Sequence, residues 1–166
     1  MGERAIAIIV SKDECHLYRS QWGGSDEVLT GVFESSHPLD RLCELEWQQT
    51  STCPPGRLVE AIDFLMAEAV YLITQHGVAV LLPLWFGLPG EVNERRRNSG
   101  VLVRVDSIDT LQTYRDTHRR FKGTIHDFVR ERTLSPADGQ RLLRQAQELV
   151  SVTSKFQLHS VANIYN

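Results

Sequence analysis

Short apolar runs, each followed by a turn signal, constrain most strongly what this chain can fold into. The first run, Ala5–Val10, is continuous and rich in β-branched residues, which is typical of a buried strand. Residues 70–74 and 78–86 form two more runs, and the Gln-His-Gly tripeptide between them indicates a hairpin. Because Pro83 lacks a backbone donor, its strand is predicted to lie at an edge, to bulge or to end there. Residues 101–105 are predicted to form a further short strand.

The stretch HLYRSQWGG, residues 16–24, follows the first strand and raises the question of whether it is a reactive site or a strand and turn. Residues 15–22 are predicted to be the hairpin partner of the first strand. Gly23 and Gly24 would end it, because glycine tolerates the positive φ angles that stop a strand. Alternation then places every second side chain on the same face of the sheet, namely His16, Tyr18, Ser20 and Trp22. Residues 25–56 show no clear periodicity.

Helical periodicity appears in three later segments. Apolar residues at helical spacing predict an amphipathic helix from residue 57 to residue 69. A longer helix is predicted from the N-cap Ser107 to about Arg132, although Gly123 costs about 1 kcal/mol relative to alanine within it. The last helix has the strongest start signal, a serine at the N-cap, a proline at the first helical position and an acid at the third: Ser135, Pro136 and Asp138.

Together these elements predict one α+β domain over residues 1–166. Its sheet is expected to be mostly antiparallel, with about five strands and about three helices packed on one face. A length of 166 residues with 42% hydrophobic content suits a single core. The first apolar run is too short for a signal peptide or a membrane span, so we expect a cytoplasmic protein with no membrane partner.

The three cysteines, Cys15, Cys43 and Cys53, have neither a CxxC arrangement nor a metal-ligand spacing with histidine. Reduced thiols are therefore expected, with no disulfide framework and no zinc or other metal site. The loop of residues 87–100 lacks the phosphate-binding pattern GxxxxGK[ST], and no cofactor is expected.

Charge is divided unevenly along the chain. Residues 1–93 hold 5 Lys and Arg against 13 Asp and Glu, a net charge of −8, whereas residues 94–166 hold 13 against 8, a net charge of +5. Such asymmetry can mark a partner for the second half, or it can reflect two halves that face one another within one domain.

The long predicted helix concentrates cations on one side. Its cations fall within about 80° of one another at helical spacing, while acidic side chains occupy a separate strip. The predicted binding surface, here called the basic stripe, adds an arginine triplet from the preceding loop: Arg95, Arg96, Arg97, Arg115, Arg119, Lys122, His126 and Arg130. Arginine suits bidentate contacts to phosphate or carboxylate groups. The alternative is a solvated helix face with local ion pairs.

An alternative site lies on the predicted sheet face. Its residues could supply a base, an acid, a nucleophile and a stacking platform: His16, Tyr18, Ser20, Trp22 and Trp85. A nucleophilic serine also needs an oriented base and an oxyanion hole, and the sequence shows neither. We therefore expect the aromatic side chains to pack in the core, Trp22 and Trp85 among them.

Four segments resemble an uncharacterised family of short haloarchaeal proteins: the opening MG-x-R-A, Ser20-Gln21-Trp22-Gly23, residues 68–72, and Leu84-Trp85-Phe86-Gly87-Leu88. The resemblance spans most of the chain and implies no catalytic residue. The family's pattern often has a histidine where Gln21 stands in this chain. Haloarchaeal cytoplasmic proteins are usually strongly acidic, so a pI of 6.1 with a basic second half calls for a polyanionic or acidic partner, or for a less saline host.

The sequence therefore predicts a binding or adaptor protein whose basic stripe contacts nucleic acid or an acidic protein. One alternative is a small enzyme with its site around His16, Tyr18 and Ser20. Another is a structural subunit of a homo-oligomer or larger assembly, in which exposed aromatic side chains would anchor the interface.

Overall fold

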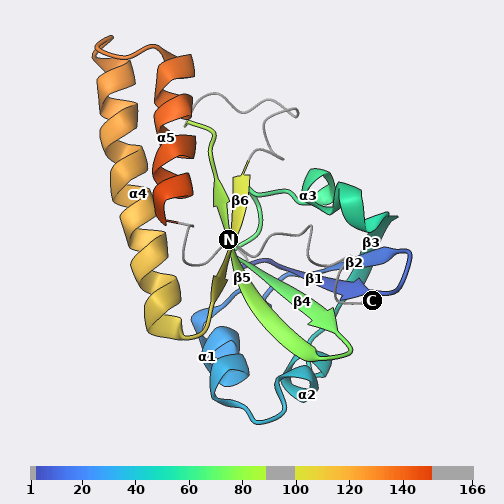
Figure 1. The fold of residues 1–166 in the computed structure, drawn as a ribbon. Helices are drawn as coiled ribbons and strands as arrows, with labels where there is room; N and C mark the ends of the chain where they lie inside the picture. Colours follow the sequence, from blue (N-terminus) through green and yellow to red (C-terminus); the bar gives the residue numbers. More distant parts are fainter. Residues whose placement is uncertain (1–2, 89–99, 151–166) are drawn as a thin grey trace.

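The computed structural model describes residues 3–88 and 100–150, with side chains described as far as residue 146. Within these ranges the chain forms six strands and five helices, with one short 3-10 turn (η1) before α3 (Figure 1). The elements are β1 Ala5–Val10, β2 Cys15–Ser20, α1 Asp26–Glu34, α2 Pro38–Cys43, β3 Gln48–Cys53, η1 Pro55–Arg57, α3 Leu58–Ala61, β4 Ala69–Thr74, β5 Gly77–Trp85, β6 Gly100–Val105, α4 Ile108–Arg130 and α5 Pro136–Val150.

All six strands belong to one sheet, in the order β3-β2-β1-β4-β5-β6. The pair β1–β4 is parallel, and the other four neighbouring pairs are antiparallel. The predicted α+β class with a mostly antiparallel sheet is therefore confirmed.

The predicted β4–β5 hairpin is confirmed as well. Gly77 begins β5 with a φ of +128°, a conformation that side-chain-bearing residues rarely adopt. Pairing with β4 extends along β5 as far as Leu81, whereas Pro83 pairs with Leu102 of β6. Pro83 thus lies at a locally unpaired edge, where its missing N–H removes no hydrogen bond to β4.

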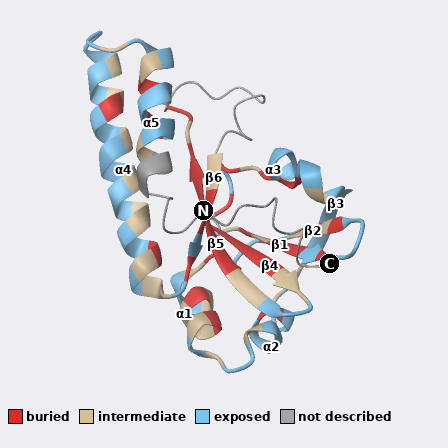
Figure 2. Ribbon diagram, in the orientation of Figure 1, coloured by how far each residue is buried: buried red, intermediate tan, exposed pale blue. Residues whose placement is uncertain are grey.

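Apolar side chains pack on both faces of the sheet, which explains why β1 is apolar at both its odd and its even positions, although Ile9 is 41% exposed. Ala5 and Ala7 contribute to a first core cluster, which α1, α2 and α4 cover. Ile8 and Val10 contribute to a second cluster on the opposite face, together with residues of α3 and the segment after it. Figure 2 shows the buried residues concentrated in the central strands between these layers. The structure thus adds a covered second face to the predicted arrangement.

The sixth strand, β3, lies in the region where the sequence showed no periodicity. Its six residues read QQTSTC; the first five are exposed and the last is partly buried, so no apolar alternation marks the strand. Helices α1 and α2 precede it in the same region. Ser25 caps α1, since its Oγ accepts a hydrogen bond from the Val28 amide at 3.3 Å.

The predicted helix of residues 57–69 is wrong beyond its first turn. Helix α3 ends at Ala61, and Ile62 has an extended conformation with φ −90° and ψ 126°. The Asp63 carboxylate accepts a hydrogen bond from the Leu65 amide at 3.1 Å, a local turn that competes with helical hydrogen bonding. Leu58 and Ile62 are still buried in the second cluster, so their spacing reflects packing on the sheet rather than a continuing helix.

Both later helices start at the predicted N-caps. The Ser107 hydroxyl accepts from the Thr110 amide at 3.1 Å, and the Ser135 hydroxyl accepts from the Asp138 amide at 3.1 Å. Helix α4 continues unbroken past Gly123 to Arg130, and α5 packs back along it (Figure 1). In the part of the chain that the structure describes, no helix has both the length and the apolar content to cross a membrane.

Candidate functional site

Trp22 is exposed on the surface, contrary to the prediction that it belongs to the core. Strand β2 ends at Ser20, two residues before Trp22, and 59% of the Trp22 surface is accessible to solvent. The turn that follows is held from both sides. The Gly24 amide donates to the Glu3 carbonyl at 2.7 Å, and the buried Tyr71 hydroxyl donates to the Gly23 carbonyl at 2.6 Å.

Gly24 is required at this turn because the space around it is already filled. A Cβ atom added there would lie 2.8 Å from the Arg4 carbonyl oxygen and 2.9 Å from the Glu68 Cβ. The double glycine thus lets the chain pass tightly against the residues at the start of β1, and Trp22 lies exposed just before it. The stretch HLYRSQWGG is therefore a strand and a turn, and its last aromatic residue is exposed rather than buried.

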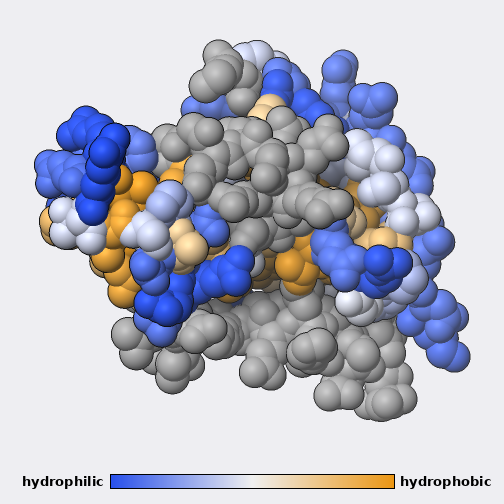
Figure 3. Space-filling view, turned by 90° about the horizontal axis from the view of Figure 1, so that it is seen from above, coloured by the Kyte–Doolittle hydropathy of each residue, from blue (hydrophilic) through white to orange (hydrophobic). Residues whose placement is uncertain are grey.

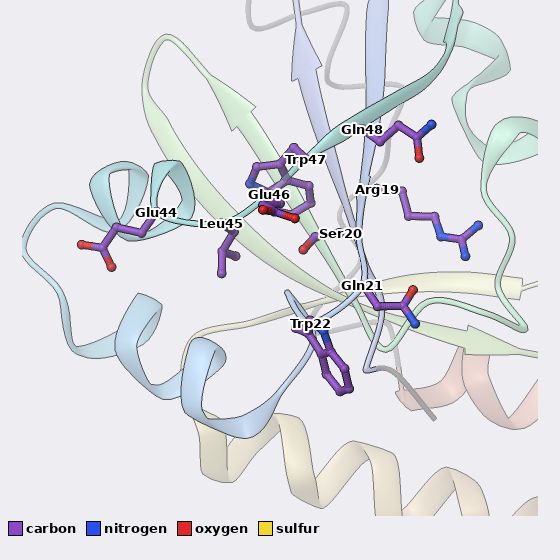
Figure 4. Close-up of a pocket in the computed structure, with 9 residues that line it drawn as sticks. All are labelled: Arg19, Ser20, Gln21, Trp22, Glu44, Leu45, Glu46, Trp47 and Gln48. Atoms are coloured by element: carbon purple, nitrogen blue, oxygen red, sulfur yellow. The ribbon is translucent and has the colours of Figure 1, made fainter.

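Two hollows flank Trp22, with volumes of about 800 Å³ and about 570 Å³. Trp22, Glu44 and Leu45 line both of them, so together they form one surface, here called the Trp22 groove. The first hollow lies beside the adjoining ends of β2 and β3 and is drawn in Figure 4. Its other lining residues are Arg19, Ser20, Gln21, Glu46, Trp47 and Gln48. The second hollow adds Glu3, Ser25, Glu27, Val28, Gly31 and Arg41.

One wall of the Trp22 groove is firmly packed. The Trp47 indole donates its Nε1–H to the Leu42 carbonyl at 2.8 Å and meets the Tyr71 ring edge-on, with ring centroids 6.2 Å apart. Burial raises the pKa of Tyr71, whose hydroxyl therefore stays protonated and keeps its hydrogen bond to the turn. Trp22 thus projects beside a preformed wall (Figure 4).

Acidic side chains predominate around the Trp22 groove. It contains four exposed glutamates, Glu3, Glu27, Glu44 and Glu46, against two arginines, Arg19 and Arg41. Arg41 is already bound, since its Nη1 lies 3.1 Å from the Glu44 carboxylate. Among the described residues, none of the other three glutamates forms an ion pair. The groove therefore offers unpaired negative charge beside an exposed indole.

The structure does not bring the predicted sheet-face site together. Ser20 is 5% exposed and shares the first hollow with Trp22. Tyr18 packs against the first core cluster, and His16 lies 3.4 Å from the Glu14 carboxylate. Trp85 belongs to the second cluster, on the other face of the sheet, where it is 9% exposed. The core prediction is thus confirmed for Trp85 and wrong for Trp22.

Four of the five described cations of the basic stripe, Arg115, Arg119, Lys122 and Arg130, contact groups within this chain. Arg115 is only 21% exposed, and its guanidinium lies 3.6 Å from Asp26 and 3.8 Å from Glu68, both in the acidic first half. Arg119 and Arg130 are exposed, and each pairs with the aspartate three residues earlier, at 3.3 Å and 3.2 Å. His126 is half-buried. In Figure 3, hydrophilic side chains lie among hydrophobic ones at the left-hand end of the molecule, where α4 and α5 lie, and other hydrophilic side chains lie at the right-hand end. Arg95, Arg96 and Arg97 lie outside the described residues.

Lys122 points away from solvent and toward β5. Its Nζ lies 4.0 Å from the centroid of the Trp85 ring and donates to the Trp85 carbonyl at 3.1 Å. The His118 Nε2 lies 3.1 Å from the same carbonyl oxygen. Burial lowers the pKa of Lys122 to about 8. Burial and the nearby Lys122 charge lower the pKa of His118 to about 4, although the Trp85 carbonyl acts in the opposite direction.

Sequence reasoning missed most of the Trp22 groove. Its second wall comes from residues 44–48, ELEWQ, which carry no periodic signal. Two glutamates flanking a leucine next to a tryptophan were the only local sign. In the described part of the chain, no group of three or more His, Cys, Asp or Glu side chains is placed to hold a metal ion.

Comparisons with known proteins supply no relative for this chain. No family model matches the sequence, and neither a curated protein nor a solved structure matches it.

Proposed function

We propose that this chain is a binding or adaptor protein whose contact surface is the Trp22 groove, and that its partner is a protein segment displaying lysine or arginine. The observation that supports this most directly is the exposure of Trp22, 59%, at a position where it lines both hollows. Exposed large aromatic side chains in concave, polar-rimmed surroundings are typical of partner contact sites.

The chemistry of the Trp22 groove favours a cationic partner. An ammonium or guanidinium group over an indole face gains about 0.5 to 2 kcal/mol, depending on how far it is desolvated. The unpaired carboxylates Glu3, Glu27 and Glu46 would add attraction at the rim and speed the encounter. A nucleic acid or an acidic protein would instead be repelled from this surface.

Binding is better supported than catalysis at this surface. Neither histidine nor cysteine lines the two hollows as described. Ser20 is the candidate nucleophile of the sequence-predicted enzyme site, yet it is buried and does not share its hollow with His16 or Tyr18. A serine nucleophile needs a base within hydrogen-bond reach, and these candidate residues do not supply one there.

The proposal is tested by replacing Trp22 with alanine and measuring binding of a fluorescein-labelled lysine-rich peptide. We expect affinity to fall about 30-fold, as for a central interface aromatic. The free energy of unfolding should change by no more than about 0.5 kcal/mol, because the side chain is exposed. Leu39→Ala is the matched control, since Leu39 is 46% exposed and lines neither hollow.

Two further measurements make this test decisive. Glu46→Lys should also weaken binding of the lysine-rich peptide, because it reverses a charge at the rim. The proposal would be contradicted if Trp22→Ala and the unmodified chain bound the lysine-rich peptide equally well. It would also be contradicted if the unmodified chain bound a glutamate-rich peptide as tightly as the lysine-rich one. Concentration-dependent self-association that Trp22→Ala abolishes would identify the partner as a second copy, consistent with the subunit alternative.

The basic stripe is a second candidate surface, favoured by the exposure of Arg119 and Arg130. If it binds nucleic acid, the affinity for single-stranded RNA should fall with salt, with a log–log slope of about 0.7 per phosphate contact. The double substitution Arg119→Gln and Arg130→Gln should then lower that slope by about 1 to 2 units. Stability should change by about 0.5 kcal/mol or less, because both ion pairs are at the surface.

Fluorescence anisotropy over a salt series provides this measurement. No binding at low salt, or a slope that the double variant leaves unchanged, would rule out the nucleic-acid alternative. If the chain binds an acidic protein and the double substitution weakens that binding, the result would support the other predicted partner of this stripe. We rank the basic stripe second because four of its described cations, Arg115, Arg119, Lys122 and Arg130, already have carboxylate or carbonyl partners.

The proposal includes a cytoplasmic location, and a haloarchaeal host on the strength of the sequence resemblance. At several molar salt the Debye length is about 3 Å or less, so rim carboxylates would contribute little. The contact with Trp22 would then carry most of the affinity, because burial of apolar surface is strengthened by excluded salts.

A further inference from the structure

Cys15 and Cys53 lie directly opposite one another in the sheet, although 37 residues separate them in the sequence. They are register partners on the antiparallel strands β2 and β3. Both contribute to the second core cluster, Cys15 within it and Cys53 packed against it, so their side chains share one face. Directly opposed residues of antiparallel strands have Cα atoms about 4.5 to 5.5 Å apart, which is within the range that a disulfide spans.

We propose that Cys15 and Cys53 are an oxidisable dithiol that a low-molecular-weight disulfide converts into a cross-strand disulfide. All three cysteines are free thiols in the structure, so the described state is the reduced one. Cys43 is exposed on α2 and has no part in the pair.

Burial sets the order of the two exchange steps. Cys53 is partly exposed and Cys15 is fully buried, so an external disulfide reaches the Cys53 sulfur first. The Cys53 thiolate attacks one sulfur of the small disulfide, whose S–S bond breaks and releases one thiolate that takes up a proton. The Cys15 thiolate then attacks the Cys53 sulfur of the mixed disulfide and releases the second small thiol. Two protein thiols are oxidised, and one small disulfide is reduced to two thiols.

The surroundings of Cys15 and Cys53 make thiol–disulfide exchange slow, but they do not disfavour the disulfide that it forms. Burial raises the pKa of Cys15 to about 11, with smaller contributions from Cys53 and Glu14. Burial and Glu14 also raise the pKa of Cys53. Little thiolate is present near neutral pH, which limits the rate. A stabilised thiolate would favour the reduced state, and this site provides no such stabilisation.

The disulfide would join the two ends of the segment 15–53 into a covalent loop, which contains β2, the Trp22 turn, α1, α2 and β3. Nearly all residues that line the Trp22 groove lie inside this segment. It would also fasten β3, an outer strand of the sheet whose side chains are mostly exposed, to its neighbour β2. Oxidation is therefore expected to stabilise the part of the chain that builds the groove.

The experiment uses the full chain with Cys43→Ser, which removes the unrelated exposed thiol. The protein is incubated with excess oxidised glutathione at pH 8.5, then examined by mass spectrometry and thiol titration. We expect both remaining thiols to be lost, the mass to fall by two hydrogens and no glutathione adduct to persist. The melting temperature should rise by about 5 to 15 °C and return on reduction.

Single substitutions test the predicted order. With Cys15→Ser added, glutathione should remain attached to Cys53, whereas with Cys53→Ser added, buried Cys15 should stay unmodified. Glu14→Gln should speed the exchange at pH 8.5 in the Cys43→Ser background, because it removes a charge that raises both thiol pKa values. A persistent adduct, two unreacted thiols or a disulfide-linked dimer in that background would each overturn the proposal.

Discussion

Replacing Trp85 with alanine is expected to lower the free energy of unfolding by about 3 to 5 kcal/mol, the usual range for truncating a buried aromatic side chain. Trp85 is 9% exposed and packs in the second core cluster at the end of β5. Its ring also lies under the Lys122 ammonium, 4.0 Å from the ring centroid. The substitution therefore removes a core side chain and a cation–π contact together.

Urea denaturation of Trp85→Ala and Trp22→Ala provides the comparison. Trp22→Ala serves as the control because it deletes the same side chain at a position that is 59% exposed, where we expect a change within about 0.5 kcal/mol. A similar loss of stability in the two variants would contradict the assigned positions of the two indoles. The contrast also separates the binding role proposed for Trp22 from any role in folding.

The strands that were predictable from the sequence are those whose apolar pattern reports burial directly. Residues of β1, β4 and β5 are mostly apolar because apolar side chains pack on both faces of the sheet. A continuous apolar run within one short segment is enough to predict such a strand. Strand β3 could not be found in this way. Its polar residues pair with β2 through the backbone, and hydrogen bonds to a distant segment leave no periodic signal.

Contacts between distant segments also explain what was missed at the candidate sites. Trp22 lies beyond the end of β2, in a turn where Gly24 passes close to the Arg4 carbonyl, and the local sequence does not reveal this contact. The basic stripe was predicted from helical spacing, yet Arg115 is paired with Asp26 and Glu68. These contacts give part of the charge asymmetry an internal explanation. The opposed cysteines are a third case, since spacing alone gave no sign that they meet.

Acid is expected to destabilise the protein between about pH 6.5 and pH 4, and His118 should account for up to about 3 kcal/mol of this loss. The folded state lowers the pKa of His118 from 6.5 to about 4, chiefly through burial, with a contribution from the Lys122 charge. The unfolded chain therefore takes up a proton that the folded chain does not bind. Stability from His118 is complete above about pH 6.5, falls as the pH decreases, and levels off below about pH 4.

This contribution can be isolated by measuring the free energy of unfolding of His118→Gln from pH 7.5 to pH 3.5. Glutamine keeps a donor for the Trp85 carbonyl and has no proton to gain, so its pH dependence should be shallower by up to about 3 kcal/mol. Lys122, with a pKa of about 8 in the folded state, is predominantly protonated throughout this range and adds little to the slope. His76→Gln, which removes an imidazole at an exposed turn, is the matched control. Parallel curves for His118→Gln and the unmodified chain would show that the fold does not disfavour protonation of His118, and would thereby contradict its assigned position against the Trp85 carbonyl.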